Sequence, residues 1–179
     1  MTSLINDILM ISRLETKEAE EARQDVRMSI VLEDVLESLK PLAASNEVLV
    51  HADCKPLCIY VSVRQMTELL SNLLSNAIKY NKPGGEVWVT ITEEDKEMII
   101  RVRDNGMGIP KESLGRIFER FYRVDKARSR ESGGTGLGLS IAKEIIDRHE
   151  GTIELVDRSG PGLTVRITLL VEGPHHGRE

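Results

Sequence analysis

The sequence of 179 residues has few cysteines, few aromatic side chains and no long apolar run. No stretch approaches the ~18 consecutive apolar residues that a membrane-spanning helix needs, and no signal peptide is recognisable. The formal net charge of −5 argues against a general nucleic-acid-binding protein, because binding to a phosphate backbone requires a basic surface. We therefore expect no nucleic-acid partner and no membrane contact by this chain.

The two cysteines, Cys54 and Cys58, form an isolated C-x-x-x-C with no second cluster. This spacing favours free thiols in a reducing cytoplasm over a metal site, so we expect a cytoplasmic location. Apolar residues make up 40% of the chain and charged residues 30%, which predicts a packed core and a soluble surface. The length fits one domain, alone or with an appendage.

Aromatic side chains are limited to one tryptophan, two phenylalanines and three tyrosines. Three of them, Phe118, Phe121 and Tyr122, lie together in the charged stretch 111–132, outside any predicted strand. A concentration of aromatic residues outside the predicted core requires a functional explanation.

The hydrophobic pattern alternates between helical and strand periods along the chain. Helices are predicted at 3–15, 29–44, 63–80 and 137–149, and strands at 25–28, 47–50, 58–61, 86–92, 98–104, 152–156 and 163–171. Neighbouring strands joined as hairpins exclude a purely parallel sheet, so the pattern favours an α/β sandwich of two layers.

The helix predicted at 63–80 carries an unusual polar face. Its members recur at intervals of three and four residues and comprise Glu68, Asn72, Asn76, Lys79 and Tyr80. A solvated face is the simpler reading, but residues 69–78 carry no charge, and asparagine forms helices worse than Glu or Lys by about half a kcal/mol. Amide oxygens on one face are suitable ligands for Mg²⁺ that also binds phosphates.

The strand predicted at 98–104 ends in a carboxylate on its apolar side. Ile100, Val102 and Asp104 alternate with two arginines, so Asp104 is predicted to be buried and to need hydrogen-bond donors. The following Gly106 and Gly108 let the backbone approach another group closely. A plain turn after a strand is one explanation, and a carboxylate that accepts a hydrogen bond from the amine of adenine is the other.

The stretch SGGTGLGLSI, residues 132–141, contains four glycines in six residues and then continues as a helix. It is not a Walker loop, because no Lys-Ser/Thr follows at the required place. It is not a dinucleotide-binding fingerprint either, because Leu139 stands at the last glycine position and no strand leads into the loop. Backbone N–H groups at a helix start with basic residues nearby suit a triphosphate.

These signals, taken in order, resemble the ATP-binding domain of bacterial two-component sensor histidine kinases, of the GHKL ATPase type. NLLSNAIKY resembles the N box, DNGMG the G1 box, FERFYR the F box and GGTGLGL the G2 box. The resemblance implies a five-stranded mixed sheet backed by three helices, the Bergerat fold. It also implies that residues 1–18 end the second dimerisation helix, that residues 19–172 form the ATP-binding domain and that residues 173–179 form a flexible tail.

The resemblance further implies a role for each matched position. Asn76 would bind Mg²⁺ with support from Asn72, Lys79 would meet phosphate, and Tyr80 would pack near base and ribose. Asp104 would accept the adenine amine, with Gly106 and Gly108 bordering the ring. Phe118 and Phe121 would anchor an ATP lid over 118–132, and Arg123 would reach the phosphates. The phosphate end would be lined by Gly134, Thr135, Gly136, Leu137 and Gly138.

Two features depart from the family pattern. Leu163 stands where the closing motif usually has a hydroxyl residue, so no nucleotide contact is assigned to Thr164. None of the four histidines, His51, His149, His175 and His176, has the setting of the family's phosphoacceptor.

The expected function is therefore the catalytic domain of a kinase that binds Mg-ATP but does not autophosphorylate. Its expected partners are ATP or ADP, the phosphoacceptor-histidine helix of the parent kinase and a response-regulator receiver domain. The parent kinase is expected to be membrane-anchored. A GHKL ATPase of the chaperone or topoisomerase kind, and a non-catalytic domain that senses nucleotide, are the alternatives.

Overall fold

The structure, a computed structural model, describes residues 23–124, 135–156 and 161–171. Its helices are α2 (Met28–Ser45), α3 (Val63–Lys79), α5 (Gly138–Arg148) and the 3₁₀ helix η1 (Lys111–Ser113). Its strands are β1 (Gln24–Arg27), β2 (Leu49–Cys54), β3 (Cys58–Val61), β4 (Glu86–Glu94), β5 (Glu97–Asp104), β6 (Thr152–Val156) and β7 (Thr164–Leu170). The predicted dimerisation helix at 1–18, the tail 173–179 and Gly134 lie outside the described residues.

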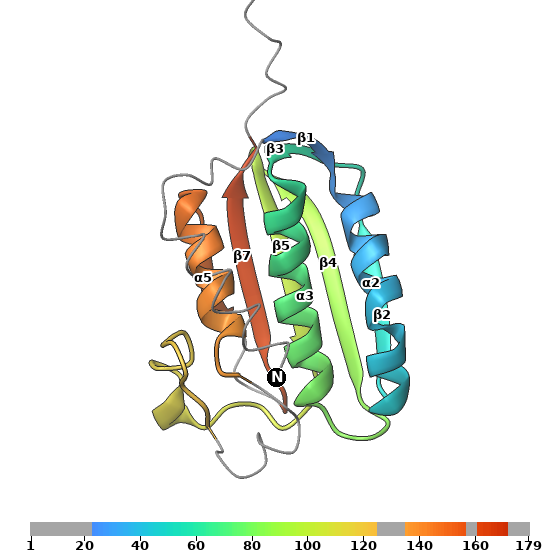
Figure 1. Cartoon of the computed structure of the whole chain (residues 1–179), viewed down its shortest axis with the longest axis vertical. Coiled ribbons are helices and arrows are strands. Elements are labelled where there is room, and N and C mark those ends of the chain that lie inside the picture. Colours follow the sequence, from blue (N-terminus) through green and yellow to red (C-terminus); the bar gives the residue numbers. More distant parts are fainter. Residues whose placement is uncertain (1–22, 125–134, 157–160, 172–179) are drawn as a thin grey trace, which may run out of the picture.

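The main sheet has five strands in the order β2-β4-β5-β7-β6. Strand β2 runs parallel to β4, and the other neighbouring pairs are antiparallel. Figure 1 shows α2, α3 and α5 side by side on one face of this sheet, where α2 contacts β2, α3 contacts β4 and β5, and α5 contacts β6. The predicted fold of a five-stranded mixed sheet backed by three helices is confirmed.

Helix α3 is the central element of the helical layer. It begins where the Ser62 hydroxyl accepts a hydrogen bond from the Gln65 N–H at 3.3 Å, an N-cap that satisfies one of the free donors of the first turn. Its leucines at positions 69, 70, 73 and 74 are at most 2% exposed. They pack on the alternating buried residues of β4, namely Val87, Val89 and Ile91. This packing fixes which face of α3 remains for polar side chains.

The strand predicted at 47–50 is wrong at its start, because the end of α2 extends further than expected. Glu47 has a φ of 54°, in the left-handed region. The N–H groups of Glu47 and Val48 donate to Ala44 and Ala43 at 3.1 and 3.0 Å and so complete the last turn of the helix. Strand β2 therefore begins at Leu49.

Strands β1 and β3 form a separate antiparallel pair beside the main sheet. Both strands were predicted from their pattern, but their pairing apart from the other strands was not. The short link from β2 to β3 contains Pro56, which lacks the N–H group that a continuing ladder needs.

None of the helices in the described ranges is long and apolar enough to cross a lipid bilayer. The thiols of half-buried Cys54 and exposed Cys58 are both free. Burial, together with the carboxylates of Asp53 and Glu33, raises the pKa of the Cys54 thiol, so this thiol stays protonated and unreactive at neutral pH. Across the same described ranges, no three His, Cys, Asp or Glu side chains are grouped to hold a metal ion.

Candidate functional site

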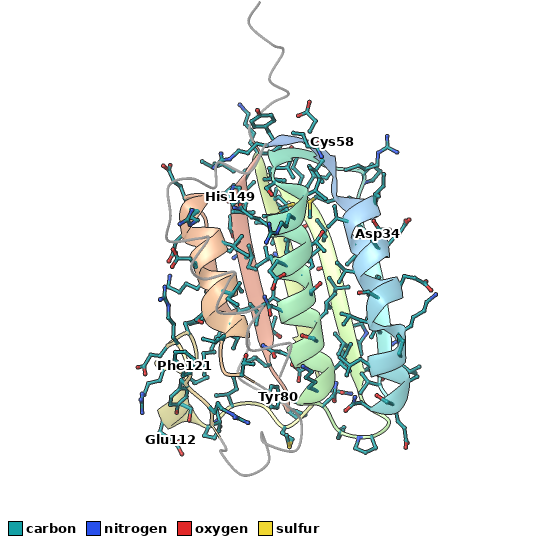
Figure 2. The ribbon with its side chains drawn as sticks, viewed as in Figure 1. Asp34, Cys58, Tyr80, Glu112, Phe121 and His149 are labelled. Carbon is teal, nitrogen blue, oxygen red and sulfur yellow. The ribbon has the colours of Figure 1, made fainter. Side chains whose placement is uncertain are left out.

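A cavity of about 480 Å³ lies between α3, the loop after β5, the start of β7 and the start of α5. This volume is within the range of small-molecule sites, about 300 to 1,000 Å³. Ten of the predicted site residues line it, namely Asn72, Asn76, Lys79, Tyr80, Asp104, Gly108, Arg123, Thr135, Gly136 and Gly138. Figure 2 shows Tyr80 at the end of α3 and Phe121 on the loop beside η1, both at the end of the molecule opposite His149.

Asp104 closes one side of the cavity. It is the last residue of β5, stands opposite Val87 of β4 and is 9% exposed, as the alternation of the strand predicts. Burial raises the pKa of its carboxyl group, while the backbone N–H groups of Gly106 and Leu163 oppose that shift. The Gly106 N–H donates to Asp104 Oδ1 at 2.9 Å. A carboxylate has about four acceptor sites, so beside these two backbone N–H groups Asp104 can accept a further hydrogen bond from a ligand amine.

The glycines after Asp104 allow two loops to touch. A Cβ at Gly106 would lie 2.7 Å from the Tyr80 carbonyl oxygen and 2.9 Å from the Asn81 Cα. Gly108 has a φ of 68°, which favours glycine. Gly106 therefore does not line the cavity itself, and instead brings the Asp104 loop against the end of α3.

The predicted metal ligands face the start of α5 across a glycine. The Asn72 amide nitrogen donates to Glu68 at 3.2 Å. A Cβ at Gly138 would lie 3.0 Å from Asn72 Oδ1 and 3.4 Å from Asn76 Nδ2. A side chain at position 138 would displace these amide groups by a few tenths of an ångström, whereas glycine leaves them free to turn toward a ligand in the cavity. Such uncharged oxygen ligands fit Mg²⁺ that shares its coordination with phosphates.

The side of the cavity at Lys79 and Arg123 is cationic. The Nε and Nη2 atoms of Arg123 are buried and have no hydrogen-bond partner among the described residues. Burying two guanidinium nitrogens without a partner is unfavourable, so this arrangement at a half-buried arginine fits an anion such as a phosphate.

Leu137 does not belong to the cavity lining, contrary to the expectation from the glycine-rich motif. Its side chain is fully buried in the core cluster together with Ile141 of α5. Its N–H donates to the Thr135 hydroxyl at 3.3 Å. Thr135 and Gly136 precede it in the lining, and Gly138 follows.

Phe121 is exposed and is not packed in the core, and most of the predicted lid, residues 125–132, lies outside the described residues. The φ of Phe121 is 64°, its N–H donates to the Gly136 carbonyl at 2.9 Å, and its side chain is 60% exposed. The left-handed backbone at this position turns the ring outward. Phe118 is half-buried, and the described residues of this stretch that line the cavity are Ile117, Tyr122, Arg123 and Val124.

A profile of the family described as Histidine kinase-, DNA gyrase B-, and HSP90-like ATPase matches residues 62–173. The chain belongs to this family. The resemblance inferred from the four motifs is thereby confirmed, and membership of this ATPase family implies that the protein binds ATP.

Curated relatives of this ATPase family include the sensor histidine kinase WalK of Bacillus subtilis, 38% identical over 94% of this chain. The sensor histidine kinase RppB of Synechocystis is 37% identical, also over 94% of this chain. The chain spans 28% of the length of the first and 38% of the second.

Solved structures agree with this assignment to the ATPase family. A mycobacterial sensor histidine kinase, MprB, has a TM-score of 0.72 and 27% identity over 83% of this chain and 97% of its own. Full-length ShkA, solved in complex with AMPPNP, has a TM-score of 0.80 and 26% identity over 96% of this chain and 36% of its own.

Proposed function

We propose that this chain is the ATP-binding catalytic domain of a sensor histidine kinase, that it lies in the cytoplasm and that its parent protein is anchored in the membrane. The proposal rests on one observation, the single cavity that joins Asp104, the two asparagines of α3, Arg123 and the start of α5. The names of the curated relatives support a kinase over the other members of the ATPase family. The complex of ShkA with AMPPNP supports a nucleotide as the ligand.

In this proposal one side of the cavity binds the adenosine part of Mg-ATP and the other side binds its phosphates and Mg²⁺. Asp104 accepts a hydrogen bond from the adenine amine, and Tyr80 packs beside the base and ribose. Asn76 and Asn72 hold Mg²⁺, which when bound neutralises part of the phosphate charge. Lys79, Arg123 and the N–H groups at the start of α5 bind the phosphate oxygens and keep the terminal phosphate in place.

The reaction of the whole kinase is a transfer from ATP to a histidine of a separate helical domain. A nitrogen of the neutral imidazole forms a bond to the γ-phosphorus while the bond from that phosphorus to the β–γ bridging oxygen breaks. ADP leaves with the bonding electron pair, and the imidazole then loses its remaining N–H proton to solvent. An aspartate of a response regulator receives the phosphoryl group afterwards, and this chain contributes positioning and charge stabilisation throughout.

Mixing this chain with a separate histidine-bearing helical domain of its parent kinase and radiolabelled ATP tests the proposal. We expect acid-labile phosphate on the helical domain only when both proteins are present, and none on this chain alone. The histidines of the described part do not line the cavity: His51 contacts Glu86 at 2.6 Å, and His149 contacts Gln65 at 2.9 Å.

Three other outcomes would contradict the proposal in different ways. Acid-labile phosphate retained on this chain alone would place the acceptor here. Rapid ATP hydrolysis without any acceptor would favour an ATPase of the chaperone or topoisomerase kind. Binding of Mg-ATP with no transfer to the acceptor domain would favour a non-catalytic nucleotide sensor.

Replacing Arg123 with glutamine is expected to weaken ATP binding about tenfold or more and to leave adenosine binding unchanged, because a hydrogen bond to a charged group contributes about 1.5 to 3 kcal/mol. Isothermal titration with both ligands measures this difference. The matched control is Arg120→Gln, because Arg120 forms a surface ion pair with Glu144 at 3.9 Å. An equal loss for ATP and adenosine would show that Arg123 supports the fold and not the phosphates.

A further inference from the structure

Two asparagines outside the predicted site connect its two halves through the backbone of Glu86, the first residue of β4. The Glu86 N–H donates to Asn105 Oδ1 at 2.8 Å, and the Asn105 N–H donates to the Glu86 carbonyl at 3.3 Å. The same carbonyl accepts a hydrogen bond from Asn81 Nδ2 at 3.1 Å. Asn81 follows the end of α3, and Asn105 follows Asp104, so one residue of β4 holds both loops.

Close packing makes this connection rigid. A Cβ at Gly85 would lie 2.1 Å from Asn81 Oδ1. A Cβ at Gly106 would lie 2.9 Å from the Asn81 Cα and 3.0 Å from Asp104 Oδ1. Asn81 is therefore enclosed between two glycines, one of which also touches the carboxylate. The Met107 N–H adds a backbone bond to the Tyr80 carbonyl at 3.4 Å.

We infer that Asn105 and Asn81 are positioning residues for nucleotide recognition: together with Glu86 they hold Asp104 at a fixed place relative to the end of α3. The inference rests on the proposed function, since the ligand is a nucleotide with an adenine base. Asn105 and Asn81 are not among the lining residues of the cavity, so they act through Asp104 and Tyr80. Groups that are already held in place bind a ligand more tightly, because less conformational freedom is lost on binding.

The test uses the full chain and two probes that each occupy half of the site, adenosine and inorganic triphosphate. Asn105→Leu keeps the size of the side chain and removes the acceptor for the Glu86 N–H. We expect about fivefold to tenfold weaker adenosine binding, the effect of one lost hydrogen bond, and unchanged triphosphate binding. Chemical-shift titration is suitable because it measures weak affinities.

A matched control separates positioning from general destabilisation. Asn46 is also half-buried, and its side-chain amide donates to the Leu42 carbonyl at 2.8 Å and to the Ser45 hydroxyl at 3.3 Å. Asn46→Leu is expected to lower the midpoint of thermal unfolding without changing the affinity for either probe. Asn105→Asp, which retains an acceptor for the Glu86 N–H, is expected to restore adenosine binding.

A double-mutant cycle provides a readout that a purely structural role would not affect, and hydrogen exchange shows whether the connection itself has opened. In Asn105→Leu the amides of Glu86 and Gly106 should exchange faster. With Asp104→Asn already present, Asn105→Leu should change adenosine affinity little, because Asn105 acts through that carboxylate. If Asn105→Leu is poorly folded, Asn81→Ala tests the same connection from the α3 side, with the same expected loss of adenosine binding.

The possible failures are distinguishable. If the unmodified chain binds no adenine nucleotide, the proposed function is wrong and this inference with it. If the unmodified chain binds and both asparagine variants bind adenosine equally well, the inference alone is wrong. Additive effects in the double-mutant cycle, or an equal loss in Asn46→Leu, would also overturn it.

Discussion

Replacing Asp104 with asparagine is expected to weaken ATP binding about tenfold to hundredfold while the domain stays folded. The loss follows from replacing a charged acceptor for the adenine amine with a neutral one, since charge-assisted hydrogen bonds contribute about 1.5 to 3 kcal/mol. In the unmodified protein the Gly106 N–H donates to Asp104 Oδ1 at 2.9 Å. The asparagine side chain has the same shape, and its amide oxygen can still accept this hydrogen bond. Titration of ATP into both proteins measures the difference.

The raised pKa of Asp104 gives this prediction a dependence on pH. Because burial raises the folded-state pKa above that of the unfolded chain, the ionised carboxylate destabilises the free protein, and this penalty disappears as pH falls through the folded pKa. Asp104→Asn should therefore be as stable as the unmodified protein at neutral pH, or more so, in a thermal unfolding experiment.

Nucleotide affinity should change with pH in the opposite sense to this stability. The amine donor needs the ionised carboxylate, so affinity falls as pH decreases through the raised pKa, at a higher pH than an ordinary aspartate would give. Asp104→Asn should lack that decrease. An asparagine variant that binds ATP as tightly as the unmodified chain would show that the adenine assignment is wrong.

The parts of the site that could be predicted from sequence each lie within one helix or one strand, where the spacing of apolar residues shows which side chains share a face. Asn72 and Asn76 follow from the helical spacing of α3, and the burial of Asp104 follows from the alternation of β5. In each case the local pattern and the tertiary packing agree, because the apolar residues that fix the face also form the core.

The parts that sequence analysis missed depend on contacts between distant segments. The connection from Asn81 and Asn105 to Glu86 involves side chains bonded to backbone, and no periodicity reports such bonds. The family resemblance implied that Phe121 anchors a lid, and it did not indicate that the N–H of this residue bonds to Gly136, that its backbone is left-handed or that its side chain is exposed. Leu137 was assigned to the cavity from a motif, whereas its side chain, at the N-cap of α5, is packed in the core.

Replacing Asn76 with alanine is expected to remove the part of ATP affinity that depends on Mg²⁺. With Mg²⁺ present the affinity for ATP should fall at least about tenfold. Mutating a residue that only hydrogen-bonds to a metal ligand already lowers metal affinity about ten- to a hundredfold, and Asn76 is itself a proposed ligand. With a chelator present the two proteins should bind ATP equally. Alanine also forms helices better than asparagine, by about half a kcal/mol, so α3 is retained. Titrations of ATP with and without Mg²⁺ provide the measurement.

Two further variants locate the effect at the metal. Ser75→Ala is the control, because Ser75 lines the same cavity but its hydroxyl donates to the Asn72 carbonyl, at 3.3 Å. Gly138→Ala adds a methyl group 3.0 Å from Asn72 Oδ1 and 3.4 Å from Asn76 Nδ2, so it should also reduce the Mg²⁺-dependent part while leaving adenosine binding intact. An equal loss for Asn76→Ala with and without Mg²⁺ would mean that Asn76 contacts the nucleotide directly and that the metal is held elsewhere.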